Sequence, residues 1–416
     1  MRLSSSKKKI AFDMLLNIVA TAIPTFVLQF LILPALADYM SDARYGLLVT
    51  ILALLNVVPA TMGNALNNVR LIIGNEKENI EDVRDYNVLL LLMAGINLIT
   101  VALFSYFYER EITLMSLFLT LVVSALWLLR EYHIVAFRIQ INYFFITISN
   151  LIMVLGYGAG FLFYRILGHW QFIYIFGYLF SLSFIFAKST LWKEPYKHSN
   201  QFKYISWQTF LLVASGLLTR ITTYADKLLI FPVLGGASVS VYYAATLFGK
   251  VVSLVISPIS GVMLSYLSKS KKKNDDTFKL AFFISSVVCI VGYFLCVAIS
   301  KPVLGFLYPQ FVGEAMQYIW LTTGTMSLSA LISVVNPFVL KFFDMKWQIV
   351  INGVYVALYV GLSMSLLGAF GLFGFCVGSV ISTALKLLFM LYIYNRRKEK
   401  SQKYMKEKQI AKEAIL

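Results

Sequence analysis

Four basic residues, Arg220, Lys227, Lys250 and Lys386, lie inside long apolar stretches of this 416-residue chain. A Lys or Arg at the centre of a membrane helix costs about 2.5–3.5 kcal/mol on insertion scales, so such a residue should face water or an anionic partner. Guanidinium and ammonium groups make charge-assisted hydrogen bonds to phosphate. These four residues are therefore predicted to bind the phosphate-bearing headgroup of an anionic substrate. Lys227, near the end of its stretch, and Lys386 could instead extend to the membrane surface.

One acid, Asp226, lies in the same stretch as Arg220 and Lys227. Arg220 and Lys227 are seven residues apart, so they share one face of a helix. Asp226 could hold a basic neighbour in place, bind a coupling cation such as Na+ or H+, or form a simple structural ion pair. The residues alone leave these three roles open, and they do not identify a coupling ion.

A second charged group, Arg130, Glu131 and Arg138, follows the fourth apolar stretch. It could form a cytoplasmic gate, although an ordinary basic anchor at the inner membrane surface would use the same residues. No motif of the HExxH, CxxC or GxxxxGK[ST] type occurs, and the three histidines are scattered. We therefore predict a transporter rather than an enzyme, with no metal and no cofactor.

About twelve apolar stretches must position these residues. Most reach the roughly 17–25 residues that a helix needs to cross a membrane. They are predicted at 14–37, 45–66, 86–108, 112–129, 143–164, 170–187, 207–234, 239–267, 280–299, 318–338, 347–367 and 371–394. The fold class is thus an all-α integral membrane protein. Within two stretches, Gly156, Gly158 and Gly160, and Gly374 with Gly378, indicate close helix packing.

The basic residues are distributed unevenly around these stretches. When the connections are numbered alternately inside and outside, most of the 36 Lys and Arg fall inside, and the outer connections hold only Arg44, Arg110, Arg165 and Lys301. Positive charge is retained on the cytoplasmic side, so both termini are predicted to be cytoplasmic. The net charge of +16 therefore reflects membrane topology and anionic lipid, and we exclude nucleic acid as a partner.

Matching residues recur in the two halves of the chain at an offset of about 200 positions. The matches include Pro34 with Pro232, Pro59 with Pro258, and Asn150 with Asn352. Six spans per half predict a parallel repeat, related by a pseudo-two-fold axis along the membrane normal. The expected domains are an N-terminal six-helix lobe at 1–190, a cytoplasmic linker at 191–206, a C-terminal six-helix lobe at 207–395 and a basic cytoplasmic tail at 396–416.

This pattern resembles the polysaccharide (O-antigen or capsule type) flippases of the multidrug/oligosaccharidyl-lipid/polysaccharide (MOP) exporter superfamily. The local likeness lies in YADKLLIFPVLGGASVSVYYAA, in LPALADYMSDARYGLL and in LLGAFGLFGFCVGSVIS. The resemblance implies alternating access through a V-shaped cavity in a bacterial plasma membrane. It implies flipping of undecaprenyl-diphosphate-linked oligosaccharide to the outer leaflet, with membrane lipids, glycosyltransferases and a polymerase as partners. Arg220, Lys250 and Lys386 would be cavity cations, with Asp226 alongside.

The first half departs from this pattern because it has no clear cation within its predicted spans. It has only polar residues there, such as Asn17, Gln29, Asn56, Asn64 and Asn97. Two other functions make different demands on the sequence. A cation-coupled multidrug exporter of the same fold would need buried acids, and only Asp226 is available. A membrane polymerase or glycosyltransferase would need a long catalytic loop with carboxylates, and no connection is long enough.

Overall fold

The computed structural model describes residues 22–73, 85–109, 113–196, 199, 201–249, 275–343 and 346–396. Within these ranges all regular structure is helical. The chain divides into two compact units, Met1–Pro232 and Val233–Leu416.

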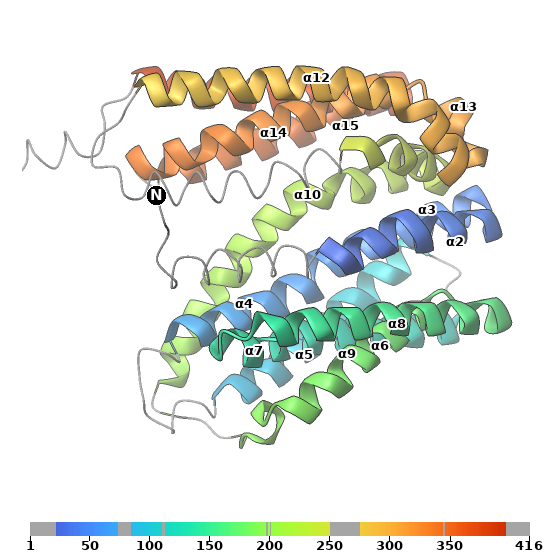
Figure 1. Ribbon diagram of the computed structural model, residues 1–416, viewed down its shortest axis with the longest axis vertical. Coiled ribbons are helices and arrows are strands. Elements are labelled where there is room, and N and C mark those ends of the chain that lie inside the picture. Colours follow the sequence, from blue (N-terminus) through green and yellow to red (C-terminus); the bar gives the residue numbers. More distant parts are fainter. Residues whose placement is uncertain are drawn as a thin grey trace, which may run out of the picture. The chain divides into compact units, whose positions relative to one another are not determined.

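The first unit is built from helices that lie side by side (Figure 1). In chain order they are η1 (Leu28–Ile32, a π-helix), α2 (Leu33–Tyr39), α3 (Asp42–Val57), α4 (Pro59–Ile73), α5 (Asp85–Tyr108), α6 (Leu114–His133), α7 (Val135–Ile139), α8 (Tyr143–Leu167), α9 (Gln171–Lys188), η3 (Leu191–Lys193) and the first part of α10 (Phe202–Ala245). Helix α8 begins where the Asn142 side chain accepts a hydrogen bond from the Phe145 backbone N–H, and it ends at Gly168, whose φ of 74° suits glycine.

Close contacts between helices in this unit depend on glycine. A Cβ atom on Gly156 or Gly160 of α8 would lie 2.5 Å from backbone oxygens of α9, whereas one on Gly158 would meet nothing within 4 Å. The prediction of close packing is therefore correct for the first and last glycine of the GxGxG sequence. On α4, a Cβ atom on Gly63 would lie 2.6 Å from the Glu131 Cβ atom of α6. The backbones of α4 and α6 therefore come close together.

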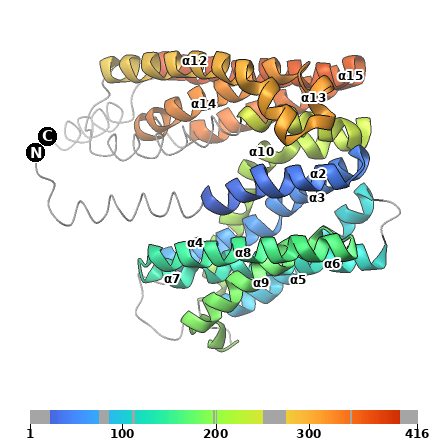
Figure 2. The ribbon, with the colours of Figure 1, turned by 45° about the vertical axis from the view of Figure 1, so that its right-hand side comes forward.

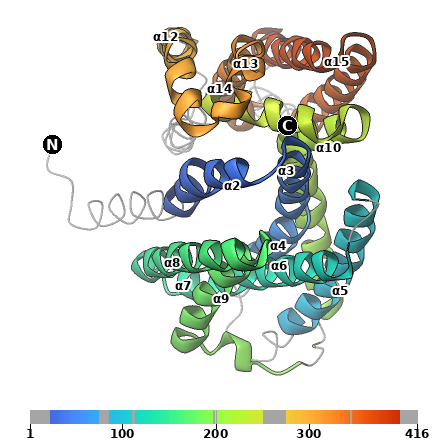
Figure 3. The ribbon, with the colours of Figure 1, turned by 90° about the vertical axis from the view of Figure 1, so that its right-hand side faces the viewer.

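The second unit contains the end of α10, α12 (Asp275–Leu307), η4 (Pro309–Phe311), α13 (Val312–Ala315), α14 (Ile319–Phe342) and α15 (Lys346–Arg396). Helix α14 packs against both α12 and α15 (Figures 2 and 3). An aromatic cluster joins them, in which Phe278 stacks on Tyr394 with ring centroids 3.9 Å apart and meets Phe338 edge-on at 5.0 Å. The Tyr394 hydroxyl is 3.1 Å from Asp275 Oδ1, at the start of α12.

Ten helices among the described residues are long and apolar enough to cross a membrane. Two of them contain a break. Gly235 interrupts α10 with φ 77°, and Phe370 and Gly371 interrupt α15. These breaks coincide with the predicted boundaries between the seventh and eighth and between the eleventh and twelfth spans. Counting both parts of each broken helix gives twelve segments in the predicted order, and the eighth predicted span beyond residue 249 lies outside the described residues.

The division of the chain into two compact units falls between Pro232 and Val233. The sequence-based lobes were instead joined by a linker at 191–206, which assigned the seventh span to the C-terminal lobe. By packing, nearly all of this span belongs with the first unit, because Tyr108 of α5 contacts it twice. The Tyr108 hydroxyl donates to the Leu228 carbonyl oxygen at 3.1 Å, and its ring packs on Phe231 at 5.6 Å.

Candidate functional site

Asp226 and Lys227 form a buried ion pair on α10. The Lys227 Nζ atom lies 2.7 and 2.6 Å from the two Asp226 carboxylate oxygens, and the Lys227 backbone N–H donates to the same carboxylate at 2.9 Å. Their exposed fractions are only 6% and 5%. Each charge therefore has an opposite charge in direct contact. This contact fits Asp226 as a holder of a basic neighbour and as a structural ion pair, and binding of a coupling cation stays a prediction.

Arg220 and Tyr224 lie one helical turn apart on α10 and both face Asn56 of α3. The Arg220 Nη1 atom lies 3.4 Å from the Asn56 carbonyl oxygen, and the Tyr224 hydroxyl donates to Asn56 Oδ1 at 3.1 Å. The Asn56 amide nitrogen donates to the Leu52 carbonyl oxygen at 2.8 Å, which fixes its orientation. Arg220 is half-buried and forms no ion pair with a described carboxylate.

The predicted gate residues come together at the ends of α6 and α7. Arg130 Nη1 lies 2.8 Å from Glu131 Oε1, and Arg130 Nη2 donates to Asn150 Oδ1 of α8. The Glu131 carbonyl oxygen accepts a hydrogen bond from Asn67 of α4 at 2.9 Å. Arg138 is linked to the same group through Asn67, so all three predicted residues are brought together. Their role as a gate stays a prediction.

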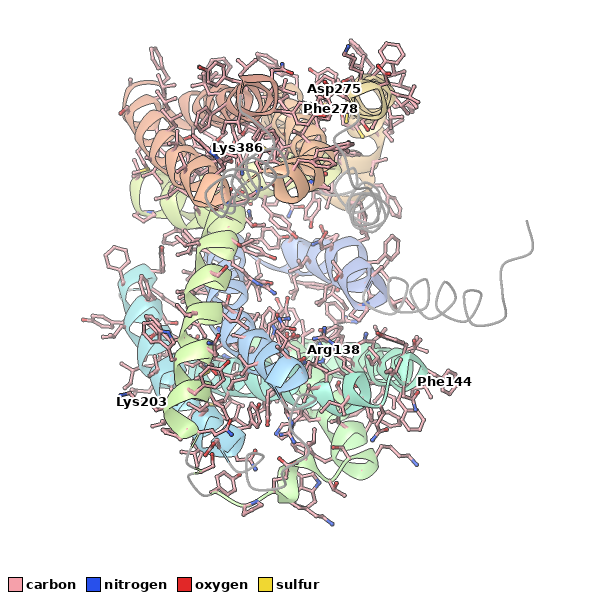
Figure 4. The ribbon with its side chains drawn as sticks, turned by 90° about the vertical axis from the view of Figure 1, so that its left-hand side faces the viewer. Arg138, Phe144, Lys203, Asp275, Phe278 and Lys386 are labelled. Atoms are coloured by element: carbon pink, nitrogen blue, oxygen red, sulfur yellow. The ribbon has the colours of Figure 1, made fainter. Side chains whose placement is uncertain are left out.

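Two amide oxygens of α4 hold Arg138. Its Nη1 atom donates to Asn67 Oδ1 at 2.6 Å and to Asn68 Oδ1 at 3.2 Å. The Asn68 amide nitrogen donates in turn to Asn64 Oδ1 at 2.8 Å. Arg138 and Asn68 are half-buried, and Figure 4 shows Arg138 close to the end of α4. Arg138, like Arg220, is thus held by neutral oxygen acceptors.

These contacts lie along one membrane-spanning segment, Asp42–Ile72, which comprises α3 and most of α4. The half-buried amide side chains of this segment and the polar side chains beside them are called the polar stripe. The polar stripe consists of Asn56, Asn64, Asn68, Arg130, Glu131, Arg138, Arg220 and Tyr224. The stripe carries three arginines and one glutamate. A Cβ atom on Gly216 of α10 would lie 2.7 Å from Thr61, so α10 and α4 are also in close contact.

Lys386 lies among the helices of the second unit (Figure 4). Its ammonium nitrogen is 4.2 Å from the centroid of the Tyr355 ring, a cation–π distance. Lys386 is half-buried and forms no ion pair with a carboxylate in the described ranges. The fourth predicted cation, Lys250, lies outside the described residues.

The absence of a clear cation within the spans of the first half stays a prediction. The candidate span Asp42–Ile72 contains Arg70 near its end, and the candidate span Leu114–Ile139 contains Arg130 and Arg138 in its last turns. These helices continue past the apolar residues. The predicted spans ended at Leu66 and Leu129, where polar residues begin. The arginine that was assigned to the second lobe, Arg220, also packs with the first unit.

Sequence reasoning missed a buried cluster around Arg70. Its two Nη atoms contact the two carboxylate oxygens of Glu194 at 2.8 and 2.6 Å, and Nη1 donates to the Tyr132 hydroxyl at 2.6 Å. Its guanidinium also lies over the Tyr86 ring at 5.1 Å. The Arg70–Glu194 contact joins residues 124 positions apart, so no local pattern indicates it.

A second set of hydrogen bonds holds the predicted linker segment, 191–206, against the helices of the first unit. Asp85 accepts hydrogen bonds from the Ser199 backbone N–H at 2.7 Å and from the Ser199 hydroxyl. The Asn87 amide donates to the Glu194 carbonyl oxygen at 2.8 Å. Arg70 and Asp85, which make these contacts, are both buried. Among the described residues, no group of three His, Cys, Asp or Glu side chains is placed to hold a metal.

Comparisons with known proteins identify the fold. No protein-family profile and no curated protein sequence matches the chain. Among solved structures, the lipid II flippase MurJ in an inward closed conformation is 13% identical, with a TM-score of 0.67 over 92% of this chain and 86% of MurJ. An inward-facing multidrug resistance MATE transporter of the MOP superfamily is also 13% identical, with a TM-score of 0.63 over 90% and 97% of the two chains.

A third structure, a MATE transporter in complex with MaD3S, has a TM-score of 0.58 at 12% identity, over 90% of this chain and 94% of that one. The chain is thus a multi-pass membrane protein with the fold of MOP-superfamily transporters. The structures it resembles include both a lipid flippase and multidrug transporters. At this level of identity the likeness concerns the fold, and the roles of single residues must come from their own surroundings.

Proposed function

We propose that this protein flips undecaprenyl-diphosphate-linked oligosaccharide repeat units from the cytoplasmic to the outer leaflet of a bacterial plasma membrane. The movement occurs by alternating access, both termini are cytoplasmic, and the product serves surface polysaccharide biosynthesis. Glycosyltransferases that build the repeat unit and a polymerase that joins it are the expected partners. The MOP-type fold supports a transporter, and the charges of the site support an anionic cargo.

The observation that carries this proposal is the kind of partner that each buried or half-buried cation has. Arg70, Arg130 and Lys227 each contact a carboxylate, so their charges are neutralised. Arg138 and Arg220 contact only amide or carbonyl oxygens among the described residues. A neutral acceptor orients a guanidinium but leaves its full positive charge.

Lys386 has the same character in the second unit, because it lies over an aromatic ring rather than against a carboxylate. Burying a cation without an opposite charge is costly in a membrane protein, so such residues mark substrate or ion pathways. A diphosphate offers several anionic oxygens and would compensate these charges during transport. We assign Arg138, Arg220 and Lys386 to headgroup binding, and we retain Lys250 for the same role from its position in the sequence. Lys227 is better assigned to the ion pair with Asp226.

The alternative is a cation-coupled multidrug exporter, which the similarity to MATE transporters favours. A cationic drug or a coupling cation needs a carboxylate whose charge is not already neutralised. In the polar stripe Glu131 pairs with Arg130, and on α10 Asp226 pairs with Lys227. Drug transport through either of these two carboxylates would require its ion pair to break during the cycle.

The proposal is tested in cells by charge-removing variants of the two arginines, Arg138→Gln and Arg220→Gln. The matched control is Lys203→Gln, because Lys203 is an exposed basic residue near the start of α10 (Figure 4). We expect both arginine variants to lose surface polysaccharide and to accumulate the lipid-linked repeat unit, while the control remains normal. Membrane levels of all three proteins should match.

Normal polysaccharide export from both arginine variants would contradict an anionic cargo. Deletion of the gene should leave drug susceptibility unchanged. Increased sensitivity to cationic drugs, with polysaccharide unaffected, would favour the exporter instead.

A further inference from the structure

Arg138 keeps one edge of its guanidinium without a protein partner among the described residues. Both of its hydrogen bonds come from Nη1, to Asn67 and Asn68. Its Nε and Nη2 atoms donate to no described group. This Nε–Nη2 edge presents two parallel N–H donors, which is the geometry that binds two phosphate oxygens at once. Arg138 is also only half-buried.

The other arginines of this region differ. Arg70 uses both Nη atoms on Glu194, and Arg130 uses Nη1 on Glu131 and Nη2 on Asn150. Both arginines also contact a carboxylate, which neutralises their positive charge. Arg138 thus combines an open donor edge with an uncompensated charge in this part of the first unit.

The two amides that hold Arg138 are themselves fixed. The Asn67 side chain donates to the Glu131 carbonyl oxygen at 2.9 Å, and the Asn68 side chain donates to Asn64 Oδ1 at 2.8 Å. Each amide nitrogen is therefore occupied, and each amide oxygen points at Arg138. An aspartate at either position would hold the guanidinium equally well but would cancel its charge. Because both side chains are asparagine, the positive charge of Arg138 is available to a ligand.

We infer that Arg138, positioned by Asn67 and Asn68, forms a phosphate-binding subsite at the ends of α4 and α7. Its ligand is a phosphate or diphosphate group. By the predicted topology this end of the helices is cytoplasmic, so the subsite is where a lipid-linked headgroup first binds. The assignment to a lipid rests on the proposed function, whereas the binding of phosphate oxygens does not. Arg138 is thereby a binding residue rather than a gate.

The test measures binding by the purified full chain in detergent, using inorganic pyrophosphate and a short-chain polyprenyl diphosphate as two separate probes. The main variant is Asn68→Asp, which retains an acceptor oxygen 3.2 Å from Arg138 and adds a negative charge. The Asn64 amide can turn to donate to the new carboxylate. We expect affinity to fall at least tenfold, with a melting temperature equal to or above that of the wild type.

Two further variants separate charge from geometry. Arg138→Lys keeps the charge but lacks the Nε–Nη2 edge, and we expect it to weaken binding about tenfold. Asn142→Asp is the matched control, because Asn142 caps α8 by accepting from Phe145 N–H at 3.2 Å and aspartate caps a helix equally well. It adds the same charge only four residues from Arg138 and should bind as the wild type does.

The outcomes distinguish this inference from the proposed function. Wild-type affinity in Asn68→Asp, or no binding of either probe by the wild type, overturns the subsite. Arg138-dependent binding of both probes supports a site for free phosphate groups. Binding of the polyprenyl probe alone supports a lipid headgroup site.

In reconstituted flipping, Asn68→Asp should raise the substrate concentration for half-maximal rate. Intact pyrophosphate binding in a protein that does not flip lipid would refute the proposed function and leave the subsite standing.

Discussion

The Arg70–Glu194 contact makes a quantitative prediction about the linker between the sixth and seventh spans. The change Glu194→Gln keeps the shape of the side chain and removes its charge. Arg70 would retain its hydrogen bond to Tyr132 but lose its only described carboxylate partner, in surroundings where its side chain is 6% exposed. We therefore expect a clear loss of stability in the first unit.

The size of this loss follows from the geometry. Removing one partner of a buried ion pair costs about 3–5 kcal/mol. The Glu194 side chain is 20% exposed, so part of the lost interaction is replaced by water and we expect about 2–3 kcal/mol. For a unit of this size, 1 kcal/mol shifts the melting temperature by about 2–4 °C, so the expected decrease is about 4–12 °C.

The assay is thermal unfolding of the purified protein in detergent, followed by intrinsic fluorescence. Lys203→Gln serves as the control, because it removes an exposed charge that makes no described ion pair. The double variant Arg70→Met with Glu194→Met should recover most of the loss, since replacing both partners leaves no isolated charge. A melting temperature for Glu194→Gln within 1 °C of the wild type would refute the view that this contact holds the linker.

Two further predictions concern helix packing and the ion pair. Gly160→Ala should destabilise the protein by about 1–3 kcal/mol, because its Cβ atom would lie 2.5 Å from α9. Gly158→Ala meets nothing within 4 Å and should be neutral or stabilising in the same thermal assay, and equal effects would contradict the packing assignment. Asp226→Asn should cost about 3 kcal/mol by isolating the Lys227 ammonium, and adding Lys227→Leu should restore stability. Flipping by this double variant would indicate a structural pair, whereas a folded but inactive double variant would indicate coupling through Asp226.

The arrangement of the spans was predictable from the sequence because long apolar stretches must each form a helix in a membrane. Even the breaks were indicated: Gly235 and Gly371 take φ values of 77° and 58° at the predicted boundaries between spans. The Asp226–Lys227 pair needed no tertiary information, since the residues are neighbours. Each of these features depends on residues that are close together in the chain, so it can be predicted from the sequence.

The partners of the arginines could not be read in this way. Asn67 and Asn68 lie 71 and 70 positions from Arg138, and Asn56 lies 164 positions from Arg220. Polar residues at the ends of apolar stretches also made the spans seem shorter than the helices are. As a result, Arg138 was predicted as a gate or an anchor, and the amides that hold it in place were not singled out.

The central claim is that arginines held by neutral acceptors move an anionic lipid headgroup. Its most direct test is flipping of a fluorescent polyprenyl-diphosphate sugar in vesicles that contain the purified protein. We predict flipping by the wild type and by Lys203→Gln, and at least a tenfold lower rate for Arg220→Gln at limiting substrate. Equal rates for Arg220→Gln and the wild type, or transport of a cationic drug in place of the lipid, would contradict the claim.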